Sequence, residues 1–132
     1  MTMTGAEASH ALDKSIATGA FERLLREPQL GGIWLSRAAN EVAGYIVLSI
    51  RFTMEYGAPS GYVDDLYDVP KFRRKGCARA LMQRLVDESR DRGCHSVQVE
   101  VGQDNVAALA LYREFGLEVL RDGRVVAAGR IE

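Results

Sequence analysis

The segment from Val69 to Met82 constrains the fold of this chain more than any other. It reads Val-Pro-Lys-Phe-Arg-Arg-Lys-Gly-Cys-Ala-Arg-Ala-Leu-Met, so the end of a strand leads through a basic loop into an amphipathic helix. The first N–H groups of a helix lack partners within it and, with the positive end of the helix dipole, form an anion site. Gly76 and Ala78 lack bulk and would let an anion approach the backbone, and the surrounding charge comes from Arg73, Arg74 and Lys75. The segment therefore predicts a strand–loop–helix unit that holds an anionic group.

The elements predicted on either side of this unit give an α/β layered domain with a mixed sheet. Apolar residues that recur every four positions predict a helix over about 11–26, ended by Pro28 and Gly31-Gly32. Further elements are recognised by alternation, β-branched residues or helical periodicity; strands are predicted at 33–35, 42–52, 62–69 and 96–101, and helices at 76–92 and from Asp104 or Asn105 to Phe115. A hairpin of 118–120 with 125–131 should turn at Asp122-Gly123. We expect residues 1–10 to be a disordered tail and 11–132 to form a single domain.

Composition excludes several classes of partner. The net charge of −1, from 17 basic and 18 acidic residues, gives no electrostatic footprint for nucleic acid. The longest apolar run, Tyr45 to Ile50, is too short to cross a membrane, and residues 1–10 carry no features of a secretion signal. Cys77 and Cys94 lie far apart and show no metal-ligand spacing. We therefore expect a cytoplasmic protein with reduced thiols and no bound metal.

Arg73-x-x-Gly76-x-Ala78 resembles the R/Q-x-x-G-x-G/A motif that binds the pyrophosphate of acetyl-CoA in GNAT N-acetyltransferases. Such a short motif has little specificity alone, but here it lies between a strand and an amphipathic helix. Arg74 stands where the family usually has Gly, and Cys77 where it has apolar residues. The resemblance implies that the cofactor acetyl-CoA is bound by Arg73, Arg74, Lys75, Gly76, Cys77, Ala78 and Arg79. The alternative is a helix start with solvated basic residues.

A second segment, from Asn105 to Leu117, resembles the N-x-x-A-x-x-L-Y-x-x-x-G-F segment of the same family. Asn105 and Tyr112 are two helical turns apart and should face the same side. The resemblance implies that Asn105 hydrogen-bonds the pantetheine arm and that the Tyr112 hydroxyl protonates the departing CoA thiolate. The alternative is that Asn105 only caps the helix while Tyr112 packs beneath the sheet.

The strand before the basic loop contains two adjacent carboxylates, Asp64 and Asp65, which are costly unless exposed or employed. Alternation predicts Asp64, Leu66 and Asp68 on one face and Asp65 and Tyr67 on the other. The segment resembles the E-D-φ-φ-V strand of diamine and thialysine acetyltransferases, where φ is apolar. By that resemblance Asp64 orients or deprotonates the acceptor amine, and the backbone of Leu66, Tyr67 and Asp68 binds the pantetheine amides. Asp68 departs from the family's Val, and a solvated acidic strand end is the alternative.

The resemblance implies a GNAT fold and transfer of the acetyl group of acetyl-CoA to a primary amine of a small molecule by direct attack. The runner-up is a degenerate domain that binds CoA without turnover. An unrelated nucleotide-binding domain is disfavoured because no Walker or Rossmann glycine pattern occurs. The family's opening strand and first helix are missing from the predicted elements, so the edge at 33–35 should lack a partner. We therefore expect a homodimer.

Overall fold

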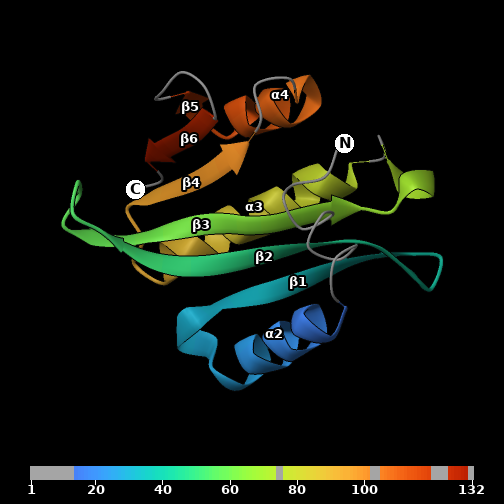
Figure 1. Cartoon of the computed structure of the whole chain (residues 1–132). Coiled ribbons are helices and arrows are strands. Elements are labelled where there is room, and N and C mark those ends of the chain that lie inside the picture. Colours follow the sequence, from blue (N-terminus) through green and yellow to red (C-terminus); the bar gives the residue numbers. More distant parts are fainter. Residues whose placement is uncertain (1–13, 74–75, 102–104, 120–124, 131–132) are drawn as a thin grey trace.

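The computed structural model describes residues 14–73, 76–101, 105–119 and 125–130, and their strands form one six-stranded mixed sheet. The helices are α2 (Lys14–Arg26), α3 (Cys77–Asp91) and α4 (Val106–Glu114), with short 3-10 turns at Pro28–Leu30 and Pro70–Phe72. The strands are β1 (Gly31–Ala38), β2 (Glu41–Thr53), β3 (Ala58–Asp68), β4 (Ser96–Val101), β5 (Glu118–Val119) and β6 (Val125–Arg130). They lie in the order β1-β2-β3-β4-β6-β5, with only β3 and β4 parallel (Figure 1). The predicted fold class and the order of its elements are confirmed.

The first hairpin is longer than the sequence predicted. Ala39 and Asn40, between β1 and β2, have φ values of 50° and 66°, as a two-residue hairpin turn of type I′ requires. β1 begins at Gly31, because the glycine pair interpreted as a helix stop belongs to the strand. A Cβ atom at Gly31 would collide with the carbonyl oxygen of Leu48 on β2, so that close approach explains the glycine. The predicted disordered tail and the turn at Asp122-Gly123 fall outside the described residues.

The core lies between α3 and the sheet. The apolar face of α3 is buried as predicted, through Leu81, Met82, Leu85 and Val86. It packs on β2 and β3, where the buried side chains include Ile46, Leu48, Val63 and Leu66. Residues on the other face of β2 meet α2, since the rings of Phe21 and Tyr45 lie 5.6 Å apart, edge to face. The two helices therefore cover opposite faces of the sheet, with α3 behind β2 and β3 in Figure 1.

The two parallel strands diverge in the middle of the sheet. The register of β3 with β4 covers Gly61–Val63 against Val97–Val99. β3 then continues to Asp68 and β4 to Val101, and Figure 1 shows β4 turning away from β3. α4 follows β4, and Tyr112 on α4 is fully buried near this point. The divergence, flanked by α3 and α4, positions the candidate site.

β3 contains a bulge at its acidic pair. The register with β2 pairs Val47 with Asp65 and Leu48 with Val63, so Asp64 is the extra residue. A bulge shifts the alternation of side chains by one position. It therefore decides which carboxylates share a face.

Candidate active site

The N-terminus of α3 presents backbone N–H groups to the divergence. Gly76 caps the helix with a φ of 84° and has no side chain with which to bond the free N–H groups. The first bond of the helix runs from the N–H of Ala80 to the carbonyl of Gly76 at 3.0 Å, which leaves the N–H groups of Cys77, Ala78 and Arg79 ahead of it. The first turn carries no acidic residue. This is the arrangement of a helix-end anion site, as the sequence predicted.

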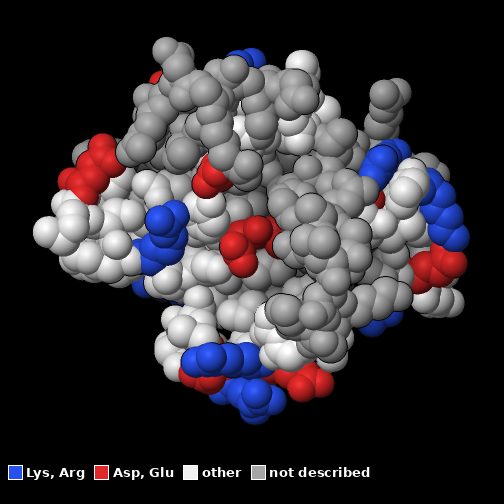
Figure 2. Space-filling view, viewed as in Figure 1, with Lys and Arg blue, Asp and Glu red and all other residues white. Residues whose placement is uncertain are grey.

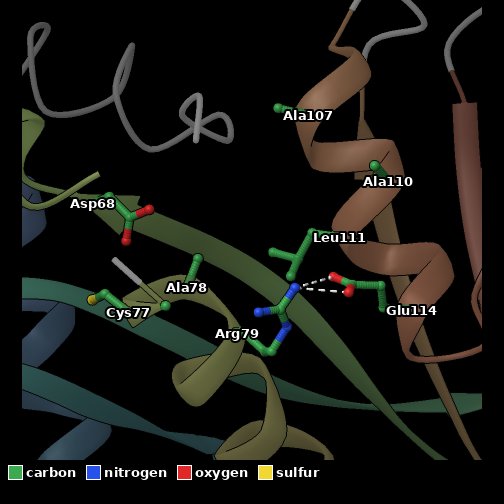
Figure 3. Close-up of a pocket in the computed structure, with 9 residues that line it drawn as sticks. Asp68, Cys77, Ala78, Arg79, Ala107, Ala110, Leu111 and Glu114 are labelled. Carbon is green, nitrogen blue, oxygen red and sulfur yellow. Dashed lines mark hydrogen bonds and ion pairs between the residues drawn. The ribbon is translucent and has the colours of Figure 1, made fainter. Parts of the chain in front are cut away.

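A cleft runs between this helix end and α4. Its lining comes from Asp68, from the start of α3 and from α4, through Gly76, Cys77, Ala78, Arg79, Ala107, Ala110, Leu111 and Glu114 (Figure 3). It encloses about 290 Å³, near the lower end of the roughly 300–1,000 Å³ of ligand pockets. A cleft of this size fits one section of a long ligand.

Basic side chains at the cleft are only partly available. Arg79 bridges from α3 to Glu114 on α4, with distances of 2.7 and 3.0 Å to the two carboxylate oxygens (Figure 3). The Nε atom of Arg73 is buried and has no hydrogen-bond partner among the described residues. Arg74 and Lys75 lie outside the described residues. Among the described basic residues of the loop, Arg73 therefore has a donor that an anion could satisfy.

Asn105 caps α4. Its side-chain oxygen accepts a hydrogen bond from the N–H of Ala108 at 3.2 Å. The capping alternative is therefore confirmed as a structural role, and a contact of Asn105 with the pantetheine arm stays a prediction. The backbone of Leu66, Tyr67 and Asp68, predicted to bind that arm, lies on the stretch of β3 beyond its register with β4.

Tyr112 has a buried hydroxyl group with no hydrogen-bond partner in the described part of the chain. Burial strongly raises its pKa, and Asp65 and then Tyr62 raise it further. The phenol is therefore neutral at physiological pH and retains a proton to donate. Because a buried hydroxyl usually finds a partner, this one is a candidate for contact with a ligand.

The two adjacent carboxylates lie in different environments. Asp64 is exposed, yet partial desolvation raises its pKa, the charge of Asp65 adds to the rise, and Arg51 opposes it. Asp65 is buried, with 8% of its surface exposed, and its carboxylate accepts a hydrogen bond from the Tyr45 hydroxyl at 3.1 Å. The predicted sharing of a face by Asp64, Leu66 and Asp68 is wrong, because the bulge removes Asp64 from that alternation.

The sequence reasoning missed the aromatic residues around the carboxylates. Tyr45 on β2 packs against Tyr67 on β3, with ring centroids 5.7 Å apart, and the guanidinium of Arg51 lies 4.6 Å from the ring centre of Tyr62. The signal that could have found Tyr45 is its antiparallel register with Tyr67, two residues from the pair of Val47 with Asp65. Figure 2 shows acidic side chains near the middle of the face presented in Figure 1.

Asp68 is the most unusual residue of the cleft. Only 2% of its surface is exposed, and its Oδ1 atom has no hydrogen-bond partner within the described residues. It reaches the helix end because Gly44 on β2 has no side chain; a Cβ there would lie 3.0 Å from Cys77 Sγ and 3.2 Å from Asp68 Oδ1. The structure thus brings Asp68, Cys77 and the predicted anion site together.

In the described ranges, no cluster of residues suited to a metal ion occurs. None of the helices within those ranges has the length and apolarity to cross a membrane. Cys77 and Cys94 are both buried free thiols.

Comparison with known proteins identifies the family. The sequence model of the acetyltransferase (GNAT) family matches residues 5–117, so the chain belongs to this family. It is similar to the [ribosomal protein bS18]-alanine N-acetyltransferase of Escherichia coli strain K12, with 43% identity over 47 residues, or 36% of this chain and 32% of that protein. The match therefore spans about a third of the length of this curated relative.

Two solved structures extend the comparison. An integron cassette protein from the mobile metagenome of Cole Harbour Salt Marsh is 38% identical, with a TM-score of 0.68 over 80% of this chain and 63% of that chain. A Salmonella typhimurium protein solved with its cofactor acetyl-CoA is 20% identical, with a TM-score of 0.73 over 91% of this chain and 75% of that chain. At that identity the second structure shows the shared fold alone.

Proposed function

We propose that this chain is an N-acetyltransferase that transfers the acetyl group of acetyl-CoA to a primary amine of a small molecule. The observation that carries the proposal is the Tyr112 hydroxyl, which is buried without a partner among the described residues and is affected by Asp65 and Tyr62 of β3, the strand that diverges from β4. A neutral phenol at this point is suited to donate a proton to a leaving group.

The residues around the cleft fit acetyl-CoA, which would supply an activated acetyl thioester. The N–H groups of Cys77, Ala78 and Arg79, with the buried Nε of Arg73, are donors suited to its pyrophosphate. The diverging stretch of β3 offers backbone groups to the pantetheine amides. The Salmonella protein of this fold, solved with acetyl-CoA as its cofactor, supports the assignment.

The acidic pair is suited to the acceptor amine. An ammonium has no lone pair, so it must lose a proton before its nitrogen can attack the thioester carbon. Asp64, whose pKa is raised by desolvation and by Asp65, is a stronger base than an ordinary carboxylate and can orient the amine and accept that proton. Asp65, which accepts a hydrogen bond from the Tyr45 hydroxyl, is one cause of that raised pKa. When the amine nitrogen bonds to the acetyl carbon and the C–S bond breaks, Tyr112 would donate its proton to the departing thiolate. The further proton that the nitrogen loses on becoming an amide would pass to solvent, from which the phenol is reprotonated.

Thiol release tests the proposal. The full chain is mixed with acetyl-CoA and with small diamines, amino sugars or a peptide that begins with alanine, and free CoA thiol is followed with a colorimetric thiol reagent. The peptide is included because the Escherichia coli relative is named for acetylating an alanine. We expect turnover with a small amine. Turnover with the peptide alone would contradict the small-molecule acceptor, and CoA binding without turnover of any amine would favour the degenerate CoA-binding domain.

The exposed edge of the sheet at β1 also supports association into a homodimer. β1 forms an edge of the described sheet, and Leu35 on it is 52% exposed. Light scattering at micromolar concentration should give the mass of a dimer, and substituting Leu35→Lys should shift it to a monomer. A monomeric mass for the unmodified chain would contradict the homodimer.

A further inference from the structure

Asp68 places a carboxyl group against the helix end that the proposed cofactor site uses. Its side chain lines the same cleft as Gly76, Cys77 and Ala78 (Figure 3). It is 98% buried, and its Oδ1 atom has no partner among the residues that the structure describes. Because Asp68 lines the cleft, a ligand there lies within reach of its carboxyl group and can supply a hydrogen bond that the described residues do not.

The protonation state of Asp68 decides whether this group attracts or repels an anion. An ionised carboxylate beside a phosphate group would meet a like charge in a poorly solvated cleft, which is unfavourable. A neutral carboxyl group carries an O–H and can donate a hydrogen bond to a phosphate or carbonyl oxygen. The two forms should therefore bind the same ligand with very different affinities.

The surroundings shift the pKa of Asp68 upward, which increases the share of the neutral form at a given pH. Burial raises the pKa of Asp68, while the neighbouring Cys77 thiol and the charge of Arg73 partly oppose the rise. β2 faces the carboxyl group with Gly44, and the cleft beyond it holds the ion pair of Arg79 with Glu114. Arg79, the first basic residue of α3, is therefore already paired with the carboxylate of Glu114 rather than with Asp68.

We propose that Asp68 is a proton-dependent binding residue for CoA, whose neutral carboxyl group donates a hydrogen bond to an oxygen of the ligand and whose ionised form repels it. This inference rests on the proposed function. Bound CoA then raises the pKa of Asp68 above its value in the free protein, so binding takes up a proton from solvent between the two values. Affinity is highest below the pKa of the free protein and falls as the pH rises above it.

Calorimetric titration of CoA into the full chain tests the inference. The affinity is measured between about pH 5.5 and pH 8 for the unmodified protein, for Asp68→Asn and for the control Asp91→Asn. Asp91 is an exposed residue at the far end of α3, so its substitution removes the same charge away from the cleft. Phosphate groups of CoA also titrate in this range, but they are common to all three proteins, so the difference between the curves isolates Asp68.

We expect the affinity of the unmodified protein and of Asp91→Asn to fall by up to about tenfold per pH unit relative to Asp68→Asn. The neutral amide of Asn should keep binding tight at the alkaline end. Parallel curves for the unmodified protein and Asp68→Asn, or weaker binding of Asp68→Asn at every pH, would overturn the inference alone. Absence of binding to all three proteins at every pH would overturn the proposed function and the inference with it.

A second measurement counts the protons exchanged on binding, with Asp68→Asn as the reference. The heat of CoA binding to the unmodified protein is compared at neutral pH in buffers with different heats of protonation. We expect the unmodified protein to take up protons when it binds CoA, and to take up more of them than Asp68→Asn does. Proton release, or no exchange of protons, would contradict the inference.

Discussion

The proposed cofactor side of the molecule, around α3 and α4, differs from the proposed acceptor side, around α2, β1 and the acidic pair of β3, in the hydrogen-bond partners of its polar groups. On the cofactor side, buried polar atoms without partners among the described residues include Asp68 Oδ1, Arg73 Nε and Tyr112 Oη. On the acceptor side, Arg23 and Glu27 form an exposed ion pair, and large apolar side chains such as Leu25 and Leu35 remain exposed. The side around α3 and α4 therefore has polar atoms that a polar ligand could satisfy, whereas the side around α2 and β1 has exposed apolar surface.

The largest expected effect comes from blocking the cofactor side at Gly76. In Gly76→Val, the new side chain would project into open space at the helix end and the backbone would be strained, because the φ of Gly76 is 84°. We expect CoA affinity to fall by about 100-fold, and the free energy of unfolding by roughly 1–2 kcal/mol from the left-handed conformation.

Gly57→Val is the matched control for this substitution. Gly57 has a φ of 59° and open space around it, and it lies in the turn between β2 and β3. It should lose similar stability, measured by thermal unfolding, and keep its CoA affinity in calorimetry. Equal CoA affinity of the Gly76→Val variant and the unmodified protein would show that the helix end does not bind the cofactor.

The next effect concerns the proton donor at the boundary between the two sides. Tyr112→Phe should lower kcat by about 100-fold, because the acid that protonates the thiolate is lost. CoA affinity should stay within about twofold, and stability should not fall, since the removed hydroxyl is buried and has no partner in the part of the chain that the structure describes. An unchanged kcat in the thiol-release assay would return Tyr112 to a packing role.

The acidic pair allows the acceptor side to be tested separately. Asp64→Asn should raise the acceptor KM or lower kcat by about tenfold while CoA affinity remains unchanged. The ionised form is the active base, so the rate of the unmodified enzyme should rise with pH through the raised pKa of Asp64. Loss of folding in Asp64→Asn would instead assign that carboxylate a structural role.

Asp65→Asn tests the coupling between the two carboxylates. It removes a neighbouring negative charge, so the pKa of Asp64 should fall and the acid limb of the pH–rate profile should move to lower pH. It also weakens the hydrogen bond from Tyr45, at a cost of about 1.5 kcal/mol in unfolding free energy. An acid limb that stays in place would show that Asp64 is not the titrating base.

The smallest effect is expected at the ion pair across the cleft. Arg79 and Glu114 are both substantially exposed, so Glu114→Gln should change stability by less than about 1 kcal/mol. Releasing Arg79 should tighten CoA binding by about threefold, in keeping with the modest energy of an exposed charge contact. Weaker CoA binding would mean that the ion pair itself shapes the site.

Local sequence patterns predicted the secondary structure around α3 and α4 well. The arrangement of the acidic pair depends instead on the register between β2 and β3, which local patterns do not give. The strand, loop and helix around Gly76 follow from consecutive residues, and the cap at Asn105 from a single side chain. The bulge at Asp64 arises from pairing between β2 and β3, which alternation within one strand does not reveal. The hydrogen bond from Tyr45 to Asp65 joins residues 20 positions apart, and it too depends on that register.

Hydrogen exchange with and without acetyl-CoA tests the central claim most directly, because it reports both sides of the molecule at once. Acetyl-CoA should slow the exchange of the N–H groups of Cys77, Ala78 and Arg79, which precede the first hydrogen bond of α3. Exchange in α2 and β1 should be unchanged by the cofactor alone. Protection confined to α2 and β1, or none at the start of α3 at saturating acetyl-CoA, would contradict the assignment of the cofactor to the cleft between α3 and α4.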